Sequence, residues 1–428
     1  MDISRRSLLQ ASALAPALQA QQPPNIIFLI SDDHSSPDLG SYGNSAVRTP
    51  NLDRLAQEGT RYTNCFVTSP QCSPNRSAIF TGKFAHTTST SRLHTPMPPW
   101  QASFLEPLKQ RGYYTGAFHK VHQGNDFNKR FDFYRQDQSF ATFFEALPKG
   151  KPFFLHVGFT DPHRPYKPGA FDPPTDPAKV KIPEWLPDTP EIRQDLALYY
   201  DAIARMDRDA GTVLKLLEDR GLAANTLVVF TGDNGMPFPP RAKGTLYDSG
   251  IRVPFIARWP GQVKPGAVDD RLLSHVDLAA MWQRAAEGVY SPAARAEIYS
   301  ERNWHDNFDL VRCVRTNTHK LIFNGIPVRP HRPISDLAES MTWISYLKLA
   351  EAGKLEAKHK TALAPTRPLL ELYDLVKDPH ERTNLADRTE HAAVQADILA
   401  RLSKWMNDTY DFLPPPFRTF KGAQRPTL

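Results

Sequence analysis

The chain has 428 residues, of which 40% are hydrophobic and 23% charged, and its formal net charge is +6. This length and composition support one large core or two domains and exclude wholesale disorder. The mild basic excess suits an anionic partner. No run of lysine and arginine interleaved with aromatic residues occurs, which argues against nucleic acid.

Residues 1–22 have the pattern of a targeting segment. Ser4–Leu9 (SRRSLL) is a twin-arginine pattern, and a short apolar stretch from Ala11 to Leu18 follows it. We expect this segment to be removed on export, which would make the mature protein periplasmic or secreted. No later stretch reaches the roughly 18 apolar residues that a membrane helix needs, so we expect no membrane span.

Three short apolar runs predict buried strands: Asn25–Ile30, Pro152–Phe159 and Thr226–Thr231. Between the last two, apolar residues recur at steps of three and four from Gln194 to Arg220, which predicts a long helix that ends before Gly221. Strands that alternate with helices favour an α/β sheet with helices on both faces.

A polar cluster follows each of these strands. The clusters are Ser31–His34 (SDDH), Thr160–His163 (TDPH) and Gly232–Gly235 (GDNG). In open α/β sheets, ligands bind beyond the carboxyl ends of the strands. The sequence therefore predicts that the three clusters converge on one site.

The rest of the chain predicts an irregular loop and a second unit. The proline-rich stretch Ala170–Pro190 is expected to be a loop over the site. Short strands at His319–Asn324 and Leu370–Leu375 and a helix at Glu390–Asn407 indicate a small C-terminal α+β domain, while Pro330–Pro368 has no clear pattern. We expect a catalytic domain over 23–295 and a smaller domain over 296–428.

The three cysteines, Cys65, Cys72 and Cys313, are too few for a disulfide scaffold in an exported chain of this length. Cys65 and Cys313 are expected to be small buried hydrophobes. Cys72 begins the sequence Cys-Ser-Pro-Asn-Arg, and Cys-x-Pro-x-Arg resembles the signature of the type I sulfatases of the alkaline phosphatase superfamily. This resemblance implies a large mixed sheet flanked by helices, and conversion of Cys72 to formylglycine by a formylglycine-generating enzyme.

The resemblance also implies a metal site. Asp32 and Asp33 match the paired aspartates of the family, and Asp233-Asn234-Gly235 matches its second metal-binding turn, with modified Cys72 as a further ligand. Oxygen ligands of this kind suit Ca²⁺, or else Mg²⁺, rather than zinc. Each motif alone is commonly an ordinary turn, and their joint occurrence after hydrophobic strands favours the metal.

The expected catalytic residues are Cys72, Arg76, Lys120, His122, His163 and Lys243. Phe118–His122 is similar to the family's Gly-Lys-x-His segment with His119 in place of glycine, and Arg241–Pro254 resembles its Lys-Gly segment. Lys120 and Lys243 should stabilise the transferring sulfate, and Arg76 should fix the nucleophile. His163 or Lys243 should protonate the leaving group, and His122 is a candidate base.

Within the family, the chain resembles the N-sulfoglucosamine sulfohydrolase branch, notably at Phe153–Arg164 and Gly232–Pro239. The implied partner is a sulfated saccharide such as a heparan-type fragment. The candidate substrate-binding residues are His34, Arg164, Arg302, Trp304 and His305. Three alternatives stay open: an O-sulfatase for another glycan, a phosphodiesterase or phosphonate hydrolase, and a non-catalytic glycan-binding relative.

Overall fold

The computed structural model describes residues 22–411, so the predicted targeting segment lies outside the described residues except for its last position. Most of the strands form an eight-stranded mixed sheet in the order β4-β3-β5-β1-β6-β7-β2-β8. Their bounds are β1 Asn25–Ser31, β2 Thr60–Phe66, β3 Tyr114–His119, β4 Phe133–Arg135, β5 Phe153–Gly158, β6 Thr226–Gly232, β7 Arg252–Arg258 and β8 Ala267–Ser274.

The three strands predicted from apolar runs are neighbours at the centre of this sheet. β1 pairs in parallel with β5 on one side and with β6 on the other, and Ser31 stands opposite Gly232 in register. All residues of the three strands are buried, because both faces of the sheet are covered. Parallel pairing brings their carboxyl ends to one edge, where the three polar clusters follow.

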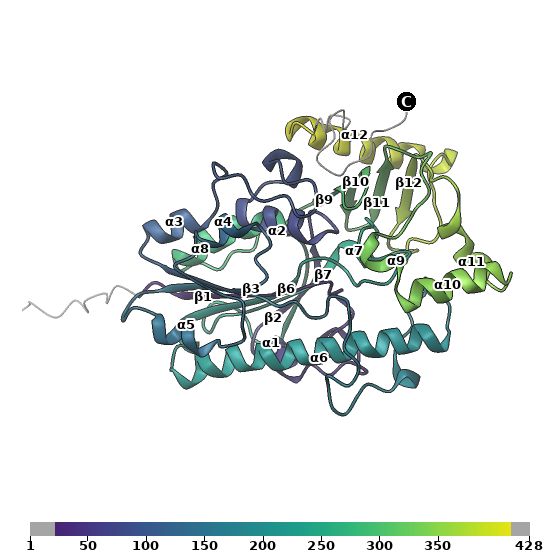
Figure 1. Cartoon of the computed structure of the whole chain (residues 1–428). Coiled ribbons are helices and arrows are strands. Elements are labelled where there is room, and N and C mark those ends of the chain that lie inside the picture. The colour runs from purple at the N-terminus through teal and green to yellow at the C-terminus, as the bar shows by residue number, and fades with distance from the viewer. Residues whose placement is uncertain (1–21, 412–428) are drawn as a thin grey trace, which may run out of the picture.

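Helices cover both faces of the large sheet, as the sequence predicts (Figure 1). Helices α1, α5 and α6 lie on one face, and α2, α3, α4 and α8 on the other. The bounds are α1 Pro50–Glu58, α2 Cys72–Thr81, α3 Leu105–Gln110, α4 Asn125–Asn128, α5 Ala141–Ala146, α6 Pro190–Asp219, α7 Asp248–Ile251 and α8 Leu278–Ala286. No helix among residues 22–411 is long and apolar enough to cross a membrane.

Helix α6 begins four residues before the predicted start at Gln194. Thr189 caps it by accepting a hydrogen bond from the backbone N–H of Ile192 at 3.2 Å, and Pro190 occupies the first turn. A threonine cap followed by proline is a favourable helix start that the apolar periodicity alone does not show.

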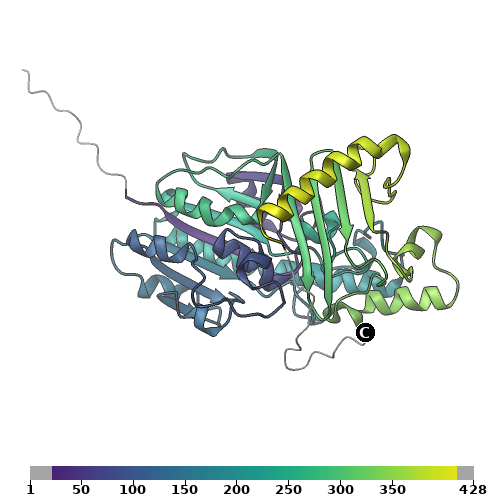
Figure 2. The ribbon, with the colours of Figure 1, turned by 90° about the horizontal axis from the view of Figure 1, so that it is seen from above.

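A second, antiparallel sheet in the order β12-β11-β10-β9 forms the C-terminal part of the molecule. Helix α12 lies across this sheet (Figure 2). The segment left unassigned from the sequence holds three helices, α9 to α11. The bounds are β9 Glu297–Trp304, β10 Phe308–Thr316, β11 His319–Asn324, β12 Leu370–Asp374, α9 Ser335–Ala338, α10 Met341–Glu351, α11 Ala357–Lys360 and α12 Ala392–Asp408.

A buried ion-pair network joins the two sheets. Lys320 on β11 is fully buried, and its Nζ lies 2.6 Å from a Glu381 carboxylate oxygen and also contacts Asp248 of α7. Burial raises the pKa of Glu381, and the charge of Lys320 opposes that rise. The lysine therefore holds the buried carboxylate of Glu381 and the partly buried one of Asp248 at the junction.

We expect Lys320→Met to lower the free energy of unfolding by about 3–5 kcal/mol, because it removes a cation from the buried Glu381 and the partly buried Asp248. Urea unfolding at pH 7 measures this difference. Lys404→Met is the matched control, since Lys404 pairs with Asp408 at 2.6 Å on the exposed face of α12 and its loss should change little. Equal stability of the two variants would contradict the role of the network.

Candidate active site

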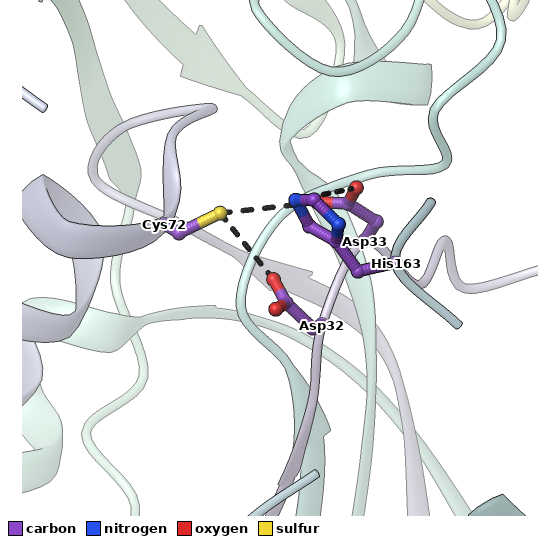
Figure 3. Close-up of side chains that lie close together, drawn as sticks. All are labelled: Asp32, Asp33, Cys72 and His163. Atoms are coloured by element: carbon purple, nitrogen blue, oxygen red, sulfur yellow. Dashed lines mark hydrogen bonds and ion pairs between the residues drawn. The ribbon is translucent and has the colours of Figure 1, made fainter. Parts of the chain in front are cut away.

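Cys72 is the first residue of α2, at the carboxyl-terminal edge of the large sheet. Its side chain is buried, and its Sγ lies 3.3 Å from Asp32 Oδ1 and 3.9 Å from Asp33 Oδ1 (Figure 3). Burial and the charge of Asp32 raise the pKa of the Cys72 thiol. The unmodified thiol is therefore held in its protonated form, which is a poor nucleophile.

Four oxygen-bearing side chains follow the carboxyl ends of two neighbouring strands. Asp32 and Asp33 follow β1, and Asp233 and Asn234 follow β6. Asp33 adopts a left-handed φ of 64°, and its backbone N–H donates to Asp233 Oδ1 at 3.0 Å. The adjacent parallel strands thus bring together the four residues that the sequence motifs single out as metal ligands.

The donor set fits a hard divalent cation. All four residues are fully buried. Asn234 Oδ1 is buried with no hydrogen-bond partner, while its Nδ2 donates to Asp33 at 2.8 Å. Burial and the charge of Asp32 raise the pKa of Asp233 to about 6. A cation bound to these oxygens would satisfy the unpartnered amide oxygen and offset the crowded negative charge, as Ca²⁺ and Mg²⁺ sites do.

Each of the three carboxylates also contacts one cationic side chain. Lys120 forms an ion pair with Asp32. Lys243 Nζ lies 2.9 Å from Asp33. Arg76, which is fully buried, donates from Nε to Asp233 at 2.8 Å. Lys120 follows β3, Lys243 lies in the loop after β6, and Arg76 belongs to α2. Together they provide the positive surroundings that a bound sulfate needs.

Two of the predicted histidines face this cluster in different electrostatic states. Burial and the charge of Lys120 lower the pKa of His122 to about 2, and its Nδ1 has no partner. Burial lowers the pKa of His163 too, but the charge of Asp33 outweighs it, so the net pKa is raised. Groups of opposite protonation state at one site suit a base and an acid, respectively.

The residue before Lys120 has a backbone conformation that favours glycine. His119 adopts a left-handed φ of 56° and His122 one of 62°. Glycine takes such a conformation without steric cost, whereas a histidine is strained in it. His119 stands where the resembling motif has glycine, and the next residue, Lys120, forms an ion pair with Asp32.

His34, a predicted substrate-binding residue, lies inside the fold. His34 is fully buried, its Nδ1 contacts Ser31 Oγ at 3.1 Å and its Nε2 contacts the carbonyl of Asp38 at 3.0 Å. Burial lowers the pKa of His34 to about 4. Both ring nitrogens are thus used inside the fold, and the side chain serves to fix the turn after β1.

His34 belongs to a set of buried neutral histidines that should make the fold acid-sensitive. Burial lowers the pKa of His34 to about 4 and those of His156 and His275 to about 3. Below about pH 6.5 the unfolded chain binds protons that the folded chain does not, so stability falls as pH falls. These three groups should together make the free energy of unfolding fall by up to about 4 kcal/mol for each pH unit near pH 5.

Urea unfolding measured between pH 7 and pH 4.5 tests this prediction. His156→Phe should reduce the slope by up to about 1.4 kcal/mol per pH unit, because one proton no longer couples to folding. His380→Gln, a change at a solvent-exposed histidine, should leave the slope unchanged. If the free energy of unfolding of His156→Phe depended on pH as steeply as that of the wild type, the lowered pKa assigned to His156 would be contradicted.

The other predicted substrate-binding residues have different surroundings. Arg164 makes two 2.7 Å bonds to Asp195 of α6, so its guanidinium end holds the loop rather than facing a ligand. Arg302 donates to the carbonyl of Gly244 at 2.6 Å, which places it beside Lys243. Trp304 packs edge-on against Phe308 and is partly exposed. His305 Nε2 lies 3.6 Å from Asp336 Oδ2, and the same oxygen lies 2.9 Å from Lys243 Nζ.

Two residues of the site were missed by the sequence reasoning. Asp336 on α9 lies 2.9 Å from Lys243 Nζ. His94 is exposed, its Nδ1 lies 2.7 Å from His122 Nε2, and its backbone N–H donates to Ser73 Oγ. Neither residue lies in a recognisable motif, and Asp336 belongs to the stretch that had no clear pattern. Long-range folding alone brings them to the site.

Comparison with known proteins identifies the family. The sulfatase family model matches residues 24–289. An ulvan-active sulfatase of Formosa agariphila is 29% identical, over 92% of this chain and 76% of the relative. The N-sulphoglucosamine sulphohydrolase of Homo sapiens is 28% identical, over 94% of this chain and 93% of the relative.

Solved structures share the fold. One protein, solved with its substrate D-glucosamine-2-N,6-O-disulfate, has a TM-score of 0.69 at 20% identity, and the match covers 92% of this chain and 99% of that one. A 2-O glycosaminoglycan sulfatase has a TM-score of 0.68 at 19% identity, with 92% and 95% covered. The alkaline-phosphatase-like fold predicted from the sequence is confirmed. Because the sulfatase family model matches more than half of this chain, the chain belongs to the sulfatase family.

Proposed function

We propose that this sulfatase removes sulfate from sulfated glycans, with N-sulfoglucosamine of heparan-type fragments as its substrate, and that Cys72 must first become formylglycine. The observation that carries the proposal is the place of Cys72. Its Sγ lies at the first turn of α2, 3.3 Å from Asp32, among three buried carboxylates and three cations. A plain buried thiol with a raised pKa has no evident use there.

The chemistry follows from the charges at the site. Hydrated formylglycine supplies one hydroxyl as nucleophile and a second that expels the sulfate afterwards. A divalent cation, held by Asp32, Asp33, Asp233 and Asn234, supplies positive charge for the sulfate oxygens. Lys120 and Lys243 add further positive charge, and Arg76 fixes Asp233. His122 is the candidate base and His163 the candidate acid, because the pKa of His122 is lowered and that of His163 is raised.

The similar proteins support the substrate class. The human relative is an N-sulphoglucosamine sulphohydrolase, and alignment with it covers more than nine tenths of both chains. The ulvan-active relative shows that a sulfatase at the same level of identity can act on another glycan. Among the predicted contacts, Trp304 and Arg302 stay candidates for the sugar and a second anionic group, since both lie next to the cluster.

Export and domain division are parts of the same proposal. A twin-arginine signal within residues 1–22 would carry a folded protein to the periplasm or beyond, after a formylglycine-generating enzyme has acted on it. A division between 23–295 and 296–428 is supported by β9, which begins the second sheet at Glu297.

The experiment that tests the nucleophile is the mass of the tryptic peptide 62–76, from protein made together with a maturation enzyme. This peptide contains both Cys65 and Cys72, so Cys65 serves as an internal control. We expect a loss of about 18 Da confined to Cys72, the change from thiol to aldehyde. An unmodified Cys72 under these conditions would contradict the mechanism and favour a non-catalytic glycan-binding protein.

A further inference from the structure

Asp336 is a carboxylate at the centre of the site that no part of the proposed chemistry uses. Its Oδ2 lies 2.9 Å from Lys243 Nζ and 3.6 Å from the Nε2 atoms of both His163 and His305. The preceding residue, Ser335, is fixed because its hydroxyl and its backbone N–H both donate to Asp306. The carboxylate is therefore held in place from the C-terminal part of the chain.

The exposure of the cluster shows where a substrate must enter. The side chains of Asp33 and Lys243 are at most 1% exposed, whereas those of Asp336 and His163 are 25% and 27% exposed. A sugar is too large for the buried part, and these two side chains are more exposed than that of Lys120, which is 18% exposed, so we place the sugar on their side. In an in-line displacement the attacking and leaving atoms lie on opposite sides of the transferred group. The leaving atom therefore comes to lie near His163 and Asp336.

The charge of Asp336 decides what kind of leaving atom fits. A carboxylate only accepts hydrogen bonds, and it repels both sulfate oxygens and the negative charge that develops on a departing oxygen. A departing nitrogen differs, because it keeps an N–H bond and gains a second on protonation. An amine or ammonium group thus donates hydrogen bonds that the Asp336 carboxylate can accept, and a departing ester oxygen, once protonated, has fewer such donors.

We infer that Asp336 recognises the leaving nitrogen of an N-sulfated amino sugar and so selects N-sulfate over O-sulfate. This inference rests on the proposed sulfatase chemistry. In the step concerned, the N–S bond breaks and its electron pair stays on nitrogen, which takes a proton from His163. The nucleophile at position 72 gains the sulfuryl group and loses its proton to His122. Asp336 accepts a hydrogen bond from the amine so formed.

Binding of the product sugar tests the inference without any turnover. Calorimetric titration of D-glucosamine and of N-acetylglucosamine into the calcium-loaded, unmatured protein compares a cationic amine with a neutral amide. We expect glucosamine to bind more tightly, and Asp336→Asn to weaken it at least ~10-fold while leaving N-acetylglucosamine unchanged. Equal binding of both sugars by the wild type, or no effect of the substitution on glucosamine, overturns the inference.

Asp132→Asn is the matched control. Asp132 also pairs with a lysine, Lys109 at 2.8 Å, and its side chain is 33% exposed. It contacts Thr115 at the amino-terminal end of β3, the opposite edge of the sheet from the site. We expect this variant to bind both sugars as the wild type does, and thermal unfolding of both variants checks that they are folded.

Activity of the matured enzyme provides a second readout. For Asp336→Asn we expect the ratio of kcat/KM on N-sulfoglucosamine to that on 6-O-sulfated glucosamine to fall at least ~10-fold. Equal losses on both substrates would mean that Asp336 only positions Lys243 and His163, which overturns the selective role. If the matured wild type hydrolyses neither substrate, the proposed function fails, and the binding experiment still decides the role of Asp336.

Discussion

Replacing Cys72 with alanine is expected to lower kcat for sulfate release by at least ~10⁴-fold, because the precursor of the nucleophile is lost. The side chain is small and lies at the start of a helix that eight further buried residues anchor, so the fold should persist. Sulfate release from N-sulfoglucosamine by protein made with a maturation enzyme measures the first effect. Binding of the intact substrate, measured by calorimetry on the same variant, checks that the site is still formed.

The other two cysteines are the controls for this experiment. Cys65 and Cys313 are fully buried, and burial raises the pKa of both thiols, as it does for Cys72. Neither has a hydrogen bond to a carboxylate of the site. Cys65→Ala and Cys313→Ala should therefore keep kcat within a few fold, with at most a modest loss of stability. Activity retained in Cys72→Ala, or lost in Cys65→Ala, would contradict the assignment.

The convergence of the site could be predicted because it depends on the central strands. Apolar runs locate β1, β5 and β6, and parallel pairing then places Asp32, His163 and Asp233 at one edge. Only the residues that follow a buried strand need to be known for this prediction. It does not need the strand order, which places β7 antiparallel beside β6 and could not be foreseen from local pattern.

The surroundings of His34 could not be predicted from the sequence pattern. His34 also follows β1, but the left-handed φ of Asp33 turns the chain, so that His34 points into the fold while Asp33 faces the site. A backbone reversal within two residues leaves no trace in hydrophobic periodicity. The same limit applies to Arg164, whose partner Asp195 lies 31 residues away on α6.

Asp336 and His94 show a second limit. Both reach the site from segments that make no strand of the large sheet, and their contacts span from 21 to 173 residues of sequence. Only the packing of the C-terminal part against the catalytic edge brings Asp336 to Lys243. Residues that shape selectivity are often supplied by such loops, whereas the residues of the reaction sit on the rigid sheet.

Substitution of Asp233 by asparagine is expected to weaken Ca²⁺ binding at least ~100-fold and to lower kcat by a similar factor or more. The change keeps the shape of the side chain and an acceptor oxygen for Arg76, but it removes one of three negative charges from a fully buried donor set. Competition with a fluorescent calcium chelator at pH 7.5 measures the affinity. This pH lies above the raised pKa of Asp233, about 6, so protons do not compete in the wild type.

Asp207→Asn separates a loss of metal from a loss of fold. Burial also raises the pKa of Asp207 to about 6, but this carboxylate accepts hydrogen bonds from the backbone N–H groups of Asn51 and Leu52 in α1. Its substitution should lower stability and leave calcium affinity unchanged, whereas Asp233→Asn should change the affinity directly. In the absence of calcium, Asp233→Asn should be at least as stable as the wild type, since it relieves repulsion from Asp32. Unchanged calcium affinity in Asp233→Asn would mean that the cation binds elsewhere, and the buried oxygen cluster would then need another explanation.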